Sequence, residues 1–111
     1  MVELTEIGLS ARIRRLEHRR SDLWSVAGGA GLAARVCREV LNGQRPPSRE
    51  MLARCCWSRV DVIAAYRERL AERLTVNLLA RAQAKAITLE IRKLRGLAIR
   101  PHRATTEEDF Q

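Results

Sequence analysis

The sequence has 111 residues, of which 21 are Lys or Arg and 13 are Asp or Glu, giving a net charge of +8. No apolar stretch approaches the roughly 20 residues that a membrane-spanning helix needs. The N-terminal residues lack the basic and apolar regions of a secretory signal. We therefore expect a cytosolic protein. Its strongly basic composition, carried by 19 arginines, favours a polyanionic partner such as DNA or RNA.

The first 41 residues predict three short helices. Ala, Leu, Arg and Glu dominate the composition, and strand-like alternation of polar and apolar residues is absent, which together favour an all-α fold. Leu9 to Arg20 form the first predicted helix, and Ser21 or Asp22 caps a short second one that carries Leu23, Val26 and Ala27. Gly28, Gly29 and Gly31 predict a tight turn, which a third helix over about residues 33–41 follows.

Residues 42–58 predict a helix end, a loop and a fourth helix. Asn42-Gly43 stops the third helix, because both residues tolerate the left-handed conformation found at helix C-termini. Residues 44–47 form an extended loop with two prolines, and Ser48 caps a fourth helix over about residues 49–57. These elements predict an N-terminal bundle of about four helices.

The second half of the chain predicts a long helix. No Pro or Gly occurs over about residues 60–95, so we expect either one helix or a helical hairpin with a hinge near residues 75–77. Gly96 ends this segment and Pro101 prevents its resumption. The acidic tail, residues 102–111, is expected to be mobile.

An apolar stripe along the long segment predicts self-association. Its members recur at spacings of three, four and seven residues, and a head of about fifty residues is too small to cover them. The expected homodimer contacts are Ile63, Leu70, Leu74, Leu78, Ala84, Ile87, Ile91 and Leu94.

Residues 30–52, AGLAARVCREVLNGQRPPSREML, resemble the Cro/C1-type (XRE, lambda-repressor-like) helix-turn-helix family. The matching features are the Ala-Gly turn, the apolar positions Cys37 and Val40, and the Asn-Gly-x-Arg-x-Pro-Ser run. Upstream, LSARIRRLEHRR resembles the family's first helix, so the resemblance covers about residues 9–56. Gly28-Gly29, and the Trp57-Ser58-Arg59-Val60 run where the family has another turn, depart from its pattern.

The resemblance implies that the third helix enters the major groove of DNA as a recognition helix. The residues it places against base edges are Ala34, Arg35, Arg38 and Glu39. Arg35 and Arg38 would fork onto guanine, and Ala34 would contact a thymine methyl. Glu39 would accept a hydrogen bond from cytosine or orient Arg35 through an i,i+4 pair. Asn42, Gln44 and Arg45 would hold the phosphate backbone.

The three cysteines, Cys37, Cys55 and Cys56, show no CxxC spacing, and His18 and His102 are isolated. We therefore predict structural cysteines that act as small apolar core residues, with no metal and no other cofactor. No catalytic constellation or phosphate-binding loop is present, so an enzyme is not expected.

The predicted organisation is a DNA-binding domain over residues 1–58, a dimerisation segment over 59–96 and a tail over 97–111. The predicted function is a sequence-specific double-stranded DNA-binding transcriptional regulator that reads a palindromic site as a homodimer, of a kind frequent in phages and mobile elements. Two alternatives stay open. One is a helical protein-interaction module, for example for RNA polymerase or another regulator. The other is an architectural DNA binder without sequence preference.

Overall fold

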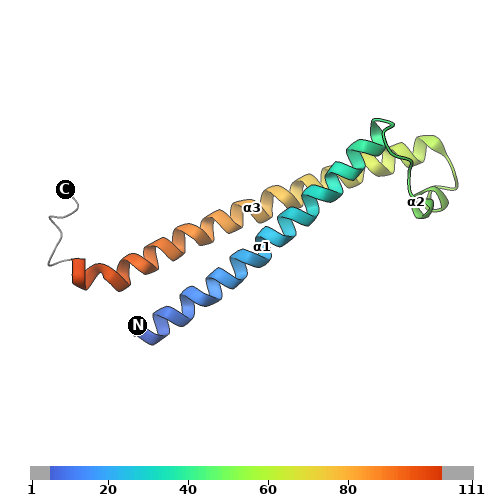
Figure 1. Cartoon of the computed structure of the whole chain (residues 1–111). Coiled ribbons are helices and arrows are strands. Elements are labelled where there is room, and N and C mark those ends of the chain that lie inside the picture. Colours follow the sequence, from blue (N-terminus) through green and yellow to red (C-terminus); the bar gives the residue numbers. More distant parts are fainter. Residues whose placement is uncertain (1–5, 104–111) are drawn as a thin grey trace. The chain divides into compact units, whose positions relative to one another are not determined.

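The computed structural model describes residues 6–103, with side chains over residues 7–97. Three helices make up this part of the chain, and it contains no strand: α1 spans Glu6–Leu41, α2 spans Arg49–Arg54 and α3 spans Arg59–Arg103 (Figure 1). The predicted all-α class and the long C-terminal helix are confirmed. The predicted bundle of about four short helices is not what the structure shows.

The chain divides into two compact units. Unit 1 consists of Met1–Leu23 and Ala82–Gln111, and unit 2 consists of Trp24–Arg81. Each unit pairs part of α1 with part of α3, and within each unit the two segments run antiparallel (Figure 1). The predicted division near residue 58 does not coincide with these units, because contacts between distant segments define them.

Unit 1 is held together by apolar packing and by polar contacts between the two helices. Leu9, Ala84, Ile87, Ile91 and Leu94 are buried. At the edges of this apolar layer, Arg12 pairs with Glu90 at 3.0 Å, Arg95 pairs with Glu17, and Arg20 donates a hydrogen bond to Thr88 at 3.2 Å. These polar side chains are partly exposed, so each pair contributes at most about 1 kcal/mol and the apolar layer dominates.

Four of the buried residues of unit 1 were predicted to form homodimer contacts, and for them the prediction is corrected. Ala84, Ile87, Ile91 and Leu94 were expected to contact a second chain, but they are 0–8% exposed within a single one. The prediction assumed that only a small head could cover them. Because the N-terminal half of α1 is a helix that lies alongside the same stretch of α3, the chain covers its own stripe.

In unit 2, α1 contributes a row of small buried residues. Ala27, Ala30, Ala34 and Cys37 are each at most 4% exposed, and their spacing of three and four residues keeps them on one helix face. Asn77 of α3 donates a hydrogen bond from Nδ2 to the Ala27 carbonyl oxygen at 2.7 Å. A Cβ at Gly31 would lie 3.4 Å from that Nδ2 atom, so the small residues admit Asn77 to the helix backbone.

The predicted turn at Gly28–Gly31 is wrong, because α1 continues through it without interruption. Gly43 is the one described glycine with positive φ, so Gly28, Gly29 and Gly31 do not adopt the conformation that a glycine turn would use. Glycine weakens a helix by about 1 kcal/mol relative to alanine. Packing of Ala27, Ala30 and Ala34 outweighs that penalty, and the three helices predicted over residues 9–41 are therefore one.

Of the two alternatives left open for residues 60–95, the structure has the single helix, and the hairpin with a hinge near residues 75–77 does not form. The helix also passes Gly96 and Pro101, which were expected to end it. A glycine inside a helix is a small penalty beside the burial of Ile91 and Leu94. No contact of the described side chains explains why the helix continues across Pro101. Residues 104–111 of the predicted mobile tail lie outside the described residues.

The predicted helix end at Asn42-Gly43 is confirmed. Gly43 adopts φ +75°, its N–H donates to the Val40 carbonyl at 3.1 Å, and the Gln44 N–H donates to the Glu39 carbonyl at 2.8 Å. This pair of hydrogen bonds is a Schellman motif. It satisfies the carbonyl groups at the end of α1 and starts the loop that leads to α2.

Ser48 caps α2, as predicted, and its Oγ accepts a hydrogen bond from the Met51 N–H at 3.2 Å. The helix ends at Arg54, three residues earlier than expected, because the chain turns at Cys55–Ser58 before α3 begins. The Ser48 N–H donates to the buried Tyr66 hydroxyl at 2.9 Å, which ties the start of α2 to α3. The core here combines Cys37, Met51, Val62 and Tyr66.

Candidate nucleic-acid interface

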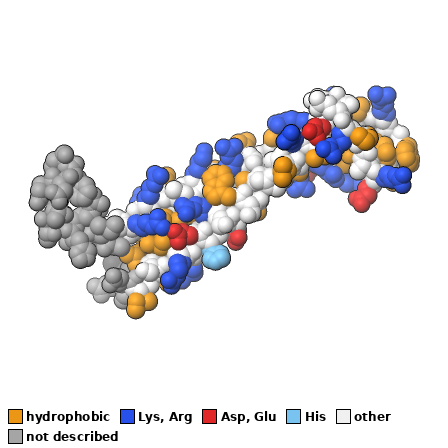
Figure 2. Space-filling view, viewed as in Figure 1, with side chains coloured by type: hydrophobic (Ala, Val, Ile, Leu, Met, Phe, Trp, Pro, Cys, Tyr) orange, Lys and Arg blue, Asp and Glu red, His pale blue; other side chains and the backbone are white. Residues whose placement is uncertain are grey.

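Unit 2 carries an excess of exposed positive charge. Between residues 24 and 81 the sequence has ten arginines and five carboxylates. Nine of these arginines are exposed, and they come from all three helices and the loop: Arg35, Arg38, Arg45, Arg49, Arg54, Arg59, Arg67, Arg73 and Arg81. Figure 2 shows Lys and Arg side chains spread over the viewed face with few acidic side chains between them. This arrangement suits a polyanionic partner.

A cluster of three charged residues lies at the C-terminal end of α1. Glu39 Oε1 accepts a hydrogen bond from Arg45 Nε at 3.0 Å and lies 2.9 Å from Arg45 Nη2, and Glu39 Oε2 lies 3.6 Å from Arg35 Nε. Of the two roles predicted for Glu39, the i,i+4 pairing with Arg35 is confirmed. One carboxylate therefore holds two of the arginines that were expected to contact DNA.

Other members of the predicted DNA-reading set separate into exposed and buried residues. Arg38 and Asn42 are exposed, and Arg38 has no ion pair with another described residue. Ala34 is 1% exposed on the buried face of α1, so its predicted contact with a thymine methyl is wrong in this fold. The neighbouring Arg35 side chain is 75% exposed, so it is available to a ligand at the surface, whereas Ala34 is not.

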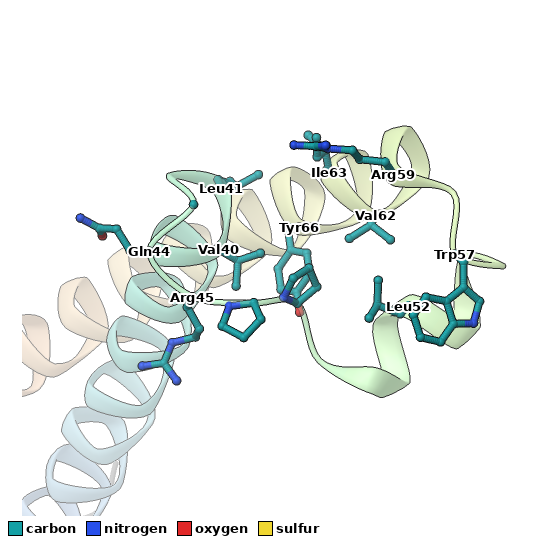
Figure 3. A pocket seen from close by; sticks show the side chains of 13 residues that line it. Val40, Leu41, Gln44, Arg45, Leu52, Trp57, Arg59, Val62, Ile63 and Tyr66 are labelled. Carbon is teal, nitrogen blue, oxygen red and sulfur yellow. The ribbon is translucent and has the colours of Figure 1, made fainter.

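The loop after α1 forms one wall of an apolar groove of about 640 Å³. Its lining includes Val40, Pro47, Leu52, Val62 and Tyr66, with Arg45 and Arg59 also contributing. Gln44 also belongs to this lining, although in Figure 3 its side chain extends away from Val40, Val62 and Tyr66. Gln44 was predicted to contact phosphate, and it is exposed.

Trp57 also lines this groove, although it was not among the predicted site residues. It is 69% exposed, and both Cys56 and Trp57 have positive φ, 53° and 61°. Left-handed backbone at non-glycine residues stores strain of about 1–3 kcal/mol and is found preferentially at functional sites. The sequence signal for this site was a large aromatic residue near a junction between two helices. Trp57 is exposed because α2 ends before it, at Arg54, and the sequence did not predict that end.

Unit 1 has a second basic surface on α1. Arg14, Arg15, His18 and Arg19 line a shallow depression together with Asp22. None of the three arginines forms an ion pair with another described residue, whereas Arg12 on the same helix does. Phosphate groups would therefore meet unpaired guanidinium groups on this surface too.

The cysteines occupy three different environments. Cys37 is buried in the core and Cys55 packs against it, which agrees with their predicted apolar role. Cys56 is exposed, so its predicted place in the core is wrong, because the chain turns outward there. The described residues contain no group of three His, Cys, Asp or Glu side chains that could hold a metal ion. Among the same residues, no helix is long and apolar enough to cross a bilayer.

No protein-family model matches this chain, and comparisons with curated proteins and with solved structures give no match. The resemblance to the Cro/C1-type family thus stays a prediction from its motif residues.

Proposed function

We propose that this protein binds double-stranded DNA through phosphate contacts made by the arginines of unit 2. The observation that carries the proposal is the imbalance of charge: ten arginines face five carboxylates, and only Arg35 and Arg45 among them form ion pairs with described residues. Exposed guanidinium groups form forked hydrogen bonds with phosphate oxygens. Displacement of counterions by such contacts supplies most of the affinity of non-specific DNA binding.

Backbone contacts fit this fold better than base reading. The expected helix-turn-helix requires a turn near residues 28–31, between its second and third helices, where α1 is continuous. Its recognition helix would also need Ala34 at the DNA surface, where burial excludes it. We therefore place this protein closer to the architectural DNA binders than to the operator-reading regulators. The alternative is a base-specific regulator, which would bind some duplex sequences more tightly than others.

The test is the salt dependence of binding to a labelled random-sequence duplex, followed by fluorescence anisotropy. Each phosphate contact contributes a slope of about −0.9 to the plot of log K against log salt concentration. We expect Arg38→Ser with Arg49→Ser to flatten the slope by about two contacts. The matched control is Arg12→Ser with Arg95→Ser, which removes the same charge from residues paired with Glu90 and Glu17. Equal slopes for the two double variants would exclude a dedicated surface on unit 2.

Glu39 gives an independent prediction, because it restrains two arginines. Glu39→Gln should raise the affinity for random duplex roughly two- to fivefold at low salt, since it removes a repulsive charge and releases Arg35 and Arg45. The same titration on a panel of duplex sequences measures the effect. If Glu39 accepted a hydrogen bond from cytosine instead, affinity would fall on a subset of sequences and stay unchanged on the others.

A second candidate function is binding of an acidic peptide in the groove beside α2. The observation that favours it is the exposure of Trp57 next to an apolar cavity with Arg45 and Arg59 in its lining. Those arginines would pair with acidic residues that flank an apolar anchor. Trp57 fluorescence in a Trp24→Phe background should respond to an acidic, leucine-containing peptide. No change with the peptide and a change with DNA would assign the region to DNA alone.

A further inference from the structure

One side of α1 in unit 1 carries a concentrated group of basic residues. Arg14, Arg15, His18 and Arg19 are all exposed, and their spacings of one, three and four residues place them on the same side of the helix. They line one shallow depression of the surface. Three guanidinium groups thus lie within about 8 Å along the helix axis. We call these four residues the unit 1 basic face.

The unit 1 basic face takes no part in holding the fold together. None of its four side chains forms a hydrogen bond or an ion pair with another described residue. Glu17 lies within the same stretch of sequence, but it pairs with Arg95 of α3 and does not neutralise the face. Arg15 and Arg19 are like charges one turn apart, which is unfavourable for the helix. An anionic ligand would relieve this repulsion.

An uncharged stretch of α1 separates the unit 1 basic face from the arginines of unit 2. Residues 23–34 contain no Asp, Glu, Lys or Arg, in a chain of which 31% is charged. They extend over about 18 Å at 1.5 Å per helical residue. Residues 74–80 of α3 are uncharged as well, and the hydrogen bond from Asn77 to the Ala27 carbonyl places them beside this stretch. The basic side chains of α1 therefore fall into two groups, one in each unit.

The interruption is unfavourable for one duplex that contacts both groups along α1. B-DNA carries one phosphate charge per about 1.7 Å of its axis, so about ten phosphates would pass the uncharged stretch without meeting a cation. Polar and charged groups that lose water without gaining a partner are destabilising. Two duplexes, one on each group of basic side chains, avoid this penalty.

We propose that the unit 1 basic face binds the phosphate backbone of a second DNA duplex, so that one chain holds two duplexes together. Arginine suits this role because its guanidinium group forms forked hydrogen bonds with phosphate oxygens. The exposed His18 supplies a further donor. This inference rests on the proposed function of unit 2, which binds the first duplex. It adds bridging of DNA segments, an activity that neither surface has by itself.

Bridging by a single chain predicts a characteristic dependence on concentration. Bridged pairs should increase as protein is added and then decrease in excess protein, where separate chains saturate each duplex. Bridging should also decrease more steeply with salt than binding of one duplex, because contacts on both surfaces release counterions.

The experiment uses the full chain and two short random-sequence duplexes, one labelled with a donor fluorophore and the other with an acceptor. Energy transfer between the duplexes measures bridging, and anisotropy of the donor duplex alone measures binding. We expect Arg14→Gln with Arg19→Gln to reduce the maximum energy transfer by about tenfold and to weaken binding of one duplex by less than about threefold. Glutamine is chosen because its helix propensity is close to that of arginine.

The matched control is Arg12→Gln with Arg20→Gln, which removes the same charge from the same helix at residues that bind Glu90 and Thr88. Energy transfer by this control should stay within about twofold of the wild type. Equal losses in the two double variants would overturn the proposal, because total charge alone would explain them. Energy transfer that persists without the two basic-face arginines would also overturn it, because bridging would then come from association of chains.

The two measurements separate this inference from the proposed function. Anisotropy without energy transfer in the wild-type chain would contradict bridging and leave the binding of one duplex by unit 2 intact. Absence of both signals would contradict the two proposals together. Far-UV circular dichroism of each variant checks that the helices are retained.

Discussion

Substitution of Ala34 by glutamate is expected to destabilise the fold by at least about 3 kcal/mol. Ala34 is 1% exposed on the inner face of α1, and no buried charged residue lies among the described residues to pair with a new carboxylate. An unpaired charge in an apolar interior carries a penalty of several kcal/mol. Because single domains are stable by only about 5–15 kcal/mol, the urea midpoint should fall sharply. Far-UV circular dichroism during urea titration measures this change.

The control for Ala34→Glu is Arg35→Glu, which introduces the same side chain at the next residue of α1. Arg35 is exposed, so Arg35→Glu loses one surface ion pair with Glu39 and should change stability by about 1 kcal/mol or less. Arg35→Glu should instead weaken DNA binding, because it replaces a positive charge of the proposed interface. If Ala34→Glu kept wild-type stability and selectively lost DNA binding, Ala34 would face DNA as the helix-turn-helix resemblance implied.

Truncation of Ile91 to alanine is expected to lower stability by about 2–4 kcal/mol. Ile91 is 1% exposed and belongs to the apolar layer of unit 1. Removal of buried methyl and methylene groups loses their transfer free energy and leaves a cavity. Thermal and urea unfolding at several protein concentrations measure the loss. Since Ile91 packs within one chain, the loss should be the same at every concentration.

Leu89→Ala is the control for Ile91→Ala, because Leu89 lies on the same helix two residues away and is 56% exposed. Its truncation should change stability by about 0.5 kcal/mol or less. A loss of stability at Ile91 that varied with protein concentration, together with a shift in sedimentation, would contradict intramolecular packing. Such a result would instead support the prediction from the sequence that Ile91 contacts a second chain.

Several features of this protein were determined by the sequence alone. The helical class follows from composition, and the end of α1 follows from Asn42-Gly43, where glycine adopts the positive φ that a Schellman motif requires. Ser48 caps α2 as its hydroxyl predicts. The excess of arginine is visible without any structure. Each of these signals depends on a few adjacent residues or on the total composition.

The candidate site could be predicted only in part. Arg35 and Glu39 pair, as their i,i+4 spacing suggested, whereas the contact of Arg45 with Glu39 was not predicted. Ala34, from the same predicted set, is buried. The sequence of α1 alone did not predict this, because it does not show which face of the helix a segment far away in the chain covers. Trp57 was missed for a related reason, since its exposure depends on the turn after α2.

Tertiary structure alone decided whether the glycine cluster bends the chain and which apolar residues are covered. Glycine at positions 28, 29 and 31 is compatible with a turn or with a helix at a difference of about 1 kcal/mol each. The choice depends on packing of Ala27 and Ala30 and on a hydrogen bond from Asn77, 50 residues further along the chain. The same continuous helix covers Ile87 and Ile91 within the chain and leaves Leu32 exposed. Packing between residues this far apart is not encoded in any local window of the sequence.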